Sequence, residues 1–458
     1  MGWGPIASAD GTLEGRLSAV SSGLRRDQRL RGMSGTLAAL VIVVWPWAVE
    51  AQTFSQKGFL EAKGIAYPQT TVQDDTRLVG EALLRYEVSA KPASWLRFSG
   101  ALDARGDTHG QTSWHGIDWS DRGLTRPGLG VRRLDAIVSR GPIALQVGKQ
   151  FIRWGKTDIL NPTDRFAPRD YLAVMDSEFL GVTAARLIAG LQSDTLDLVL
   201  ARFTPSRTPL LDQRWSGLPA ELESVQFVDV GAAFPQQPQA GARWSHVGRG
   251  YEFSLAAFHG NNNLPLTEAA APATGLGLPA TGVTLPPAAG TQQTAVIPVT
   301  RAYPNMWMAG GDVAVPLAAF TIKGEAAFFG TDDSRADEYW LYVIQLERQS
   351  GEWFFAGGYA GEAVTTSRVQ AEFAPDRGMT KAFLGRAGYT IDTNRSLAFE
   401  GAIRQTGDGS WLRGEYSQAS GRHLRVTGRA TWIRGEATDF FGRYSKNSNV
   451  AVTIRYSF

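Results

Sequence analysis

The charged side chains between Trp154 and Leu180 are the residues of this chain whose types and spacing could act on a solute. Charges of both signs that face each other across a narrow aqueous pore create a transverse field, which orients polar solutes and excludes apolar ones. Alternatively, these charges only solvate an outer loop, with Asn161-Pro162 and Asp164 forming its turns. The charged members of this segment are Asp158, Asp164, Arg165, Arg169, Asp170, Asp176 and Glu178.

A second set of charges lies on one face of the predicted strands near the C-terminus. Glu400 and Glu415 share that face, so the excess of arginine could form a cationic wall that favours anionic solutes. Alternatively, Arg–Glu ladders brace neighbouring strands, since opposite charges across strands contribute roughly 0.2–1 kcal/mol each. Bracing is the stronger interpretation, and both roles can coexist. The basic members are Arg386, Arg404, Arg413, Arg425, Arg429 and Arg455.

Other reactive side chains form no recognisable site. His109 and His115 share a predicted loop with several aspartates, but no tight ligand spacing supports a metal site. His259 and His423 lie in no nucleophile pattern, and the chain has no phosphate-binding, zinc or calcium motif. Cysteine is absent, which excludes disulfides and thiolate chemistry. We therefore predict no catalytic residue, no metal and no cofactor.

Apolar and polar residues alternate in segments of about ten residues, which is typical of β-strands. The charged residues on these segments should therefore be positioned by strands. In the last segment Val450, Val452, Ile454, Tyr456 and Phe458 point to one side, and the intervening polar residues point to the other. In a membrane barrel the apolar side meets lipid and the polar side lines the lumen. The alternation alone does not distinguish this arrangement from a soluble sheet.

The lengths of the connections favour the membrane barrel. From Ser55 onward we count about 18 strand candidates, joined alternately by tight turns such as Arg140-Gly141-Pro142 and by long segments such as 106–126 and 204–239. Outer-membrane barrels have short periplasmic turns and long extracellular loops. Tryptophan and tyrosine near the predicted strand ends fit the membrane boundary. The predicted fold is an all-β, antiparallel, up-and-down transmembrane barrel.

The N-terminal segment is a predicted signal peptide. The 13 apolar residues from Leu37 to Val49 are too few for a membrane helix, which needs about 20. Four arginines precede this run and Val49-Glu50-Ala51 follows it, so we place cleavage after Ala51. The basic region is long, and the true start could lie downstream, for example at Met33. Residues 52–458 then form a single barrel domain.

Two further features shape the expected barrel. The segment 261–304 is rich in alanine, proline, glycine and threonine and should be a mobile loop. The segment 154–180 is the third outside loop in our count and is a candidate to fold into the lumen as a constriction. The net charge of +2 gives no support to a nucleic-acid partner.

The final residues Val452 to Phe458 resemble the terminal β-signal of Gram-negative outer-membrane proteins. That resemblance implies recognition by the barrel-assembly machinery. The strand count resembles 18-stranded porins, including alginate-export and substrate-specific porins. The stretch from Gly148 to Asp158, followed by Asn161-Pro162-Thr163-Asp164 and Pro168-Arg169-Asp170, is similar to a pattern in uncharacterised porin-like barrel proteins.

These observations predict an outer-membrane, porin-like channel for passive diffusion of small hydrophilic solutes, with anionic solutes included. It would contact outer-membrane lipid and lipopolysaccharide, and it could be a homo-oligomer. One alternative is a dedicated exporter or importer of an acidic polysaccharide or organic acid. Another is an outer-membrane barrel enzyme or a structural barrel.

Overall fold

The structure is a computed structural model that describes residues 53–158, 160–218, 222, 225–269, 296–368 and 373–458. The predicted signal peptide, residues 1–51, lies outside the described residues. Among the described residues, no helix is long and apolar enough to cross a membrane.

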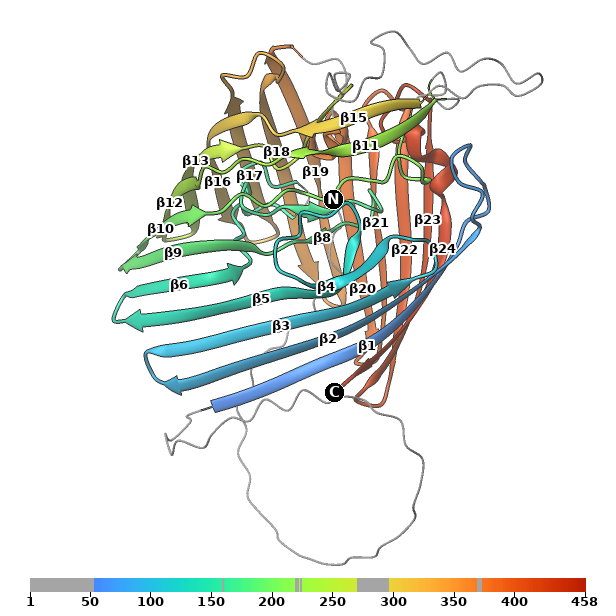
Figure 1. Ribbon diagram of the computed structural model, residues 1–458. Coiled ribbons are helices and arrows are strands. Elements are labelled where there is room, and N and C mark those ends of the chain that lie inside the picture. The colour runs from blue at the N-terminus through green and yellow to red at the C-terminus, as the bar shows by residue number, and fades with distance from the viewer. Residues whose placement is uncertain (1–52, 159, 219–221, 223–224, 270–295, 369–372) are drawn as a thin grey trace, which may run out of the picture. The chain divides into compact units, whose positions relative to one another are not determined.

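Eighteen strands form one closed antiparallel barrel, as the sequence predicted (Figure 1). Each strand pairs with the next barrel strand along the chain. The barrel strands are β1 (Thr53–Ala66), β2 (Leu78–Ala93), β3 (Leu96–Asp107), β5 (Arg126–Arg140), β6 (Ile143–Gln150), β9 (Val182–Leu191), β10 (Asp194–Ala201), β12 (Gln239–Gly248), β13 (Tyr251–Asn261), β16 (Asn305–Pro316), β17 (Thr321–Gly330), β18 (Glu338–Ser350), β19 (Trp353–Thr366), β20 (Ala382–Asp392), β21 (Arg395–Arg404), β22 (Gly409–Ser420), β23 (Leu424–Gly435) and β24 (Asn449–Ser457).

The last strand closes the barrel against the first. β24 pairs antiparallel with β1, with Tyr456 opposite Leu60 and Arg455 opposite Glu61. Figure 1 shows these two ends of the chain side by side, β1 in blue and β24 in red. Closure removes the free edges that an open sheet would expose, which is a condition for crossing a membrane with strands.

Alternation places apolar side chains on the outside of the wall. On β18, Trp340, Tyr342, Ile344 and Leu346 are exposed, whereas the intervening side chains are buried. The inner face is not uniformly polar, however, because Leu341 and Val343 also point inward and are fully buried. The alternation of apolar and polar residues does not predict these inward apolar residues, because they are covered by loops inside the barrel.

The connections follow the predicted alternation of lengths, with exceptions. Gly141-Pro142, Gln192-Ser193 and Thr393-Asn394 join neighbouring strands at one end. At the other end most connections are long, but residues 405–408 between β21 and β22 are a short one. Within the long connections lie a short helix α1 (Pro375–Gly378) and a 3-10 helix η2 (Gly442–Asn447).

The long connections also contain extra strands. β4 (Thr112–Asp118) pairs in parallel with β5, and β7 (Arg169–Asp170) pairs with β8 (Glu178–Phe179). A separate sheet combines β11 (Gln226–Ala233), β15 (Val296–Ala302) and β14 (Leu266–Ala269), and lies at the end of the barrel away from the C-terminus (Figure 1).

The segment expected to be one mobile loop, 261–304, therefore has strands at both ends. Asn261 is the last residue of β13, and β14 and β15 pair with each other through Leu266 opposite Ala302. Backbone pairing with β11, from a different loop, stabilises these ends. Composition carried no information about that pairing. The central residues 270–295 lie outside the described residues.

Candidate functional site: a loop that crosses the barrel

The connection between β6 and β9, residues 151–181, leaves the wall and contacts strands on other sides of the barrel. We call it the crossing loop. Its Lys156 Nζ lies 2.5 Å from Glu252 of β13, and its Asp158 Oδ2 lies 3.0 Å from Lys323 of β17. Further along, Asp176 Oδ2 lies 3.0 Å from Lys63 of β1. Because β6 and β9 are neighbours and these partners lie on the inner faces of distant strands, the loop runs through the interior.

Apolar side chains hold the crossing loop against the inner wall at two places. Trp154 and Phe166 are almost fully buried and pack edge to face, with ring centroids 5.2 Å apart, beside inward residues of β9, β13 and β16. Val174 and Met175 lie in a second cluster with Trp411 of β22. Full burial of one such apolar side chain contributes roughly 1.5–3 kcal/mol to the free energy of folding. The loop is therefore a packed element of the interior.

Asp170 in the crossing loop forms the centre of one ion-pair group. Its Oδ2 accepts hydrogen bonds from Arg126 Nε at 3.0 Å and from Arg207 Nη1 at 2.6 Å, and its Oδ1 accepts one from the backbone N–H of Leu172. Burial acts to raise the pKa of Asp170, but Arg126 and Arg207 outweigh it and lower this pKa to about 2. The carboxylate is therefore charged at neutral pH.

Glu178 forms the centre of a second group. Its Oε2 accepts a hydrogen bond of 2.6 Å from Arg105 Nη2, and Arg105 also donates to Asp103 Oδ2 at 2.8 Å. Arg85 donates to the other oxygen of Asp103 at 2.7 Å. Burial acts to raise the pKa of Glu178, yet the charges of Arg105, Arg132 and Arg85 together hold it far below its usual range.

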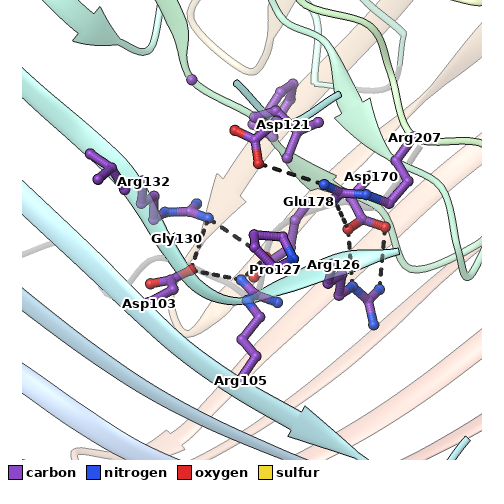
Figure 2. Close-up of a pocket in the computed structure, with 14 residues that line it drawn as sticks. Asp103, Arg105, Asp121, Arg126, Pro127, Gly130, Arg132, Asp170, Glu178 and Arg207 are labelled. Atoms are coloured by element: carbon purple, nitrogen blue, oxygen red, sulfur yellow. Dashed lines mark hydrogen bonds and ion pairs between the residues drawn. The ribbon is translucent and has the colours of Figure 1, made fainter. Parts of the chain in front are cut away.

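A small pocket, partly open to solvent, lies between these two groups (Figure 2). Each of its four carboxylates already accepts a hydrogen bond from an arginine or a lysine. The lining includes the arginines Arg105, Arg126, Arg132 and Arg207 and the acids Asp103, Asp121, Asp170 and Glu178.

The unused hydrogen-bonding capacity of this pocket is on the donor side. Arg132 lies 3.6 Å from Glu178 and 3.8 Å from Asp103, and among the described residues it donates no hydrogen bond. The buried Nη2 of Arg207 likewise has no hydrogen-bond partner in the described part of the chain. Guanidinium donors bind carboxylates in a directed, charge-assisted manner. Arg132, whose side chain is 20% exposed, is therefore the donor that the pocket offers to an anionic group, because Nη2 of Arg207 is buried and lies 3.6 Å from Asp121.

Asp176 meets the arginines of the C-terminal strands. It lies 3.0 Å from Arg429 Nη1 and 3.9 Å from Arg413 Nη1. Glu415 and Glu400 hold the same two arginines from the neighbouring strands, at 3.2 Å and 3.1 Å. Alternating charges of this kind support the bracing interpretation of the basic wall.

The other predicted basic residues have different partners. Arg404 Nε donates to Asp439 at 2.7 Å, and Arg455 Nε donates to Glu61 at 2.7 Å. Arg386 lies opposite Glu400 in the register of β20 and β21. Arg425 donates to Ser417 Oγ at 3.0 Å and forms no ion pair with any described residue.

The remaining charged residues that the sequence singled out in this loop form contacts within the loop or with adjacent segments. Asp164 accepts hydrogen bonds from Arg153 Nε and from the backbone N–H of Trp154. Arg165 pairs with Asp376 of α1 at 3.2 Å, and Arg169 lies over the ring of Phe179.

Sequence reasoning missed much of the pocket. Arg85, Asp103 and Arg105 were on the polar side of predicted strands, and this was the available indication. Arg126 begins β5 after a long loop, Arg132 lies where the register of β5 against β3 shifts, and Arg207 lies in an irregular connection, so no periodicity pointed to them. Among the described residues, no group of three or more histidine or acidic side chains is placed to hold a metal ion.

Comparison with known proteins supports the fold. No protein-family model matches this chain, and no curated protein is significantly similar to it in sequence. The structure is similar to that of a BenF-like porin from Pseudomonas fluorescens Pf-5, with 11% identity, a TM-score of 0.51, and coverage of 89% of this chain and 98% of the porin. It is also similar to OccAB4 of Acinetobacter baumannii, with 8% identity, a TM-score of 0.50, and coverage of 90% and 99%. The chain therefore has the fold of an 18-stranded porin-type barrel.

Proposed function

We propose that this protein is an outer-membrane channel for passive diffusion of small hydrophilic solutes, with small carboxylates favoured. The observation that carries the proposal is the crossing loop, which leaves a charged pocket with the partly exposed guanidinium of Arg132 inside a closed barrel. Barrels of 16–18 strands are wide enough for an aqueous channel, so an inward loop decides what passes. The structural neighbour described as a BenF-like porin supports the same class of protein.

The charge arrangement gives the proposed preference. A carboxylate that enters the pocket finds donors on Arg132 without having to displace an existing hydrogen bond. A cation finds only carboxylates that already accept from arginine or lysine. The channel should therefore conduct anions better than cations of similar size, by a modest factor, because the ion pairs nearly balance.

Location and partners follow from the outer surface. Exposed aromatic and aliphatic side chains on every barrel strand would contact lipid, and the strand that ends at Phe458 would be recognised by the barrel-assembly machinery. We place the protein in the outer membrane, exported by the segment 1–51 and surrounded by phospholipid and lipopolysaccharide. We propose no enzymatic activity. The ion-paired basic residues on β21 to β24 do not favour the alternative of a dedicated polysaccharide exporter.

Reconstitution in a planar bilayer tests the proposal. We expect discrete conductance steps. In a KCl gradient, the sign of the reversal potential should show that chloride permeates better than potassium. Gluconate should reduce the current, and glucose should not. The variant R132Q should lose most of the gluconate effect and keep its conductance, because Arg132 donates no hydrogen bond to any described residue. A silent bilayer with correctly folded protein would contradict the channel, and cation preference would contradict the role of the pocket.

A further inference from the structure

Glu325 on β17 is the point at which the wall holds the first part of the crossing loop. Its Oε2 accepts hydrogen bonds from the backbone N–H groups of Lys156 at 3.0 Å and Thr157 at 3.4 Å. Its Oε1 accepts from the backbone N–H of Thr163 at 2.9 Å and from the Thr163 hydroxyl at 2.8 Å. One side chain thus joins two parts of the loop that are six residues apart.

The site requires a carboxylate of this length. Glu325 is 3% exposed, and it forms no ion pair with any described residue, so neutral donors alone satisfy its two oxygens. A buried polar group without its partners costs roughly 1–3 kcal/mol, and more when charged. Each carboxylate oxygen of Glu325 faces at least one backbone N–H donor. In the variant E325Q, one of these oxygens would be replaced by an amide N–H₂ group, which is itself a donor, in either orientation of the amide.

The loop sequence fits this anchor. Gly155 has φ of +93°, and a Cβ at this position would lie 2.7 Å from the Glu325 carboxylate. On the next strand, Gln345 Oε1 accepts from the backbone N–H of Asp158 at 3.0 Å. The side-chain amide of Asn161 donates to the carbonyl of Thr157 and closes the turn between the two anchored parts. The Trp-Gly-Lys-Thr-Asp and Asn-Pro-Thr-Asp stretches therefore have a structural role as the part of the loop that docks on β17 and β18.

We propose that Glu325 is the positioning residue of the channel: it fixes the crossing loop across the lumen and thereby sets the width of the path and its discrimination between solutes. This inference rests on the proposed channel function. Glu325 does not line the pocket and acts through the loop. Loss of the anchor should release residues 155–163 while the barrel stays closed, because none of these hydrogen bonds belongs to a strand ladder.

The variant E325Q tests the proposal, with E87Q as its matched control. Glu87 on β2 faces the lumen and pairs with the exposed Lys57 at 3.4 Å, and it forms no hydrogen bond or ion pair with the described residues of the crossing loop. In single-channel recordings E325Q should raise the open conductance by roughly twofold, increase current noise and reduce the difference between gluconate and glucose. E87Q should leave all three unchanged, and both variants should keep the heat-modifiable mobility of a folded barrel.

Limited trypsin digestion gives a readout that does not depend on conduction. The wild type should resist cleavage after Lys156, whereas E325Q should be cut there and nowhere in the strands. If E325Q does not assemble, T163V, which removes one donor and keeps the volume, carries the test, and it should show the same changes to a smaller degree.

The outcomes separate the two proposals. Unchanged conductance, noise and trypsin pattern in E325Q or T163V, beside a conducting wild type, would overturn the role of Glu325 and leave the channel in place. A folded but silent wild type would overturn the channel, and the trypsin pattern would still decide whether Glu325 anchors the loop.

Discussion

The carboxylate of Asp176 lies 3.0 Å from the guanidinium of Arg429, although 253 residues separate them in the chain. The same oxygen lies 3.0 Å from Lys63 Nζ. Lys63 belongs to β1 and Arg429 to β23, the two strands that flank the closing strand β24. The far end of the crossing loop is thus tied to both sides of the barrel closure.

Removing this tie should increase anion selectivity. D176N leaves Lys63 and Arg429 without the charge that they share, so the field at the pore becomes more positive. We expect the chloride-to-potassium permeability ratio to rise by roughly twofold or more. Reversal potentials in a KCl gradient measure this ratio.

The control for D176N is D392N, which removes the same charge at an exposed turn where Asp392 pairs only with Arg395 within the described residues. D392N should not move the reversal potential. An equal shift in both variants would show that the effect comes from net charge and not from the tie at Asp176.

The ion pairs centred on Asp170, Asp176 and Glu178 should survive mild acid. The folded-state pKa of Asp170 is lowered to about 2, and those of Asp176 and Glu178 also lie below their usual range. Groups with a depressed folded pKa contribute stability that is present above the unfolded pKa, near 4, and is lost as the pH falls through the folded value.

The contribution of these three carboxylates to the conductance should therefore stay constant from pH 7 to about pH 4 and be lost only as the pH falls toward 2. Burial raises the pKa of Asp164, so its pair with Arg153 is expected to weaken first in acid. Conductance recorded at stepwise lower pH on the wild type, D164N and D176N measures this. Loss of the difference between the wild type and D176N already near pH 5 to 6 would contradict the described ion pairs.

G155A should loosen the crossing loop through its contact with Glu325. The positive φ makes alanine unfavourable by roughly 1 kcal/mol, and the added Cβ would also press on the carboxylate. G351A is a matched control, since Gly351 also has positive φ, +56°, but a Cβ there meets nothing within 4 Å. Both should lower the melting temperature slightly, and only G155A should expose the loop to trypsin. Equal trypsin patterns in the two variants would contradict the contact.

Phe458 should matter for assembly in the cell more than for the folded state. Its backbone exchanges two hydrogen bonds of 2.9 Å with Gly58, which any residue could make, and its ring remains about half exposed. F458A should therefore refold in detergent like the wild type, yet reach the outer-membrane fraction at a severalfold lower level. Quantifying the heat-modifiable band in both preparations tests this. Equal levels in cells would contradict recognition of the terminal strand.

Local patterns explain why most of the barrel was predictable. The tight turn Gly141-Pro142 and the alternation of residues 450–458 depend on neighbours in sequence, and they fix strand direction and facing. The closure of β24 on β1 then follows from an even number of antiparallel strands. The inward apolar residues Leu341 and Val343 were not predictable in this way, because their burial depends on a loop from another part of the chain.

The candidate site was predictable only in outline. The charged loop could be singled out, since Asp170, Asp176 and Glu178 lie within nine residues of one another. Their partners could not, because Arg126, Arg207 and Arg429 are brought to them by barrel closure and loop crossing. Glu325 reads as an ordinary polar residue of an alternating strand. Only the three-dimensional arrangement shows backbone donors around it.

Replacing residues 156–176 with a short glycine–serine linker tests the central claim most directly, because the claim is that the crossing loop narrows an open barrel to a charged path. Single-channel conductance of the wild type and of this variant should be recorded side by side, with folded barrels in both. The wild type should conduct in small steps with anion preference, and the variant in steps several times larger. Equal conductance, or a wild type that stays closed while only the variant conducts, would contradict the account.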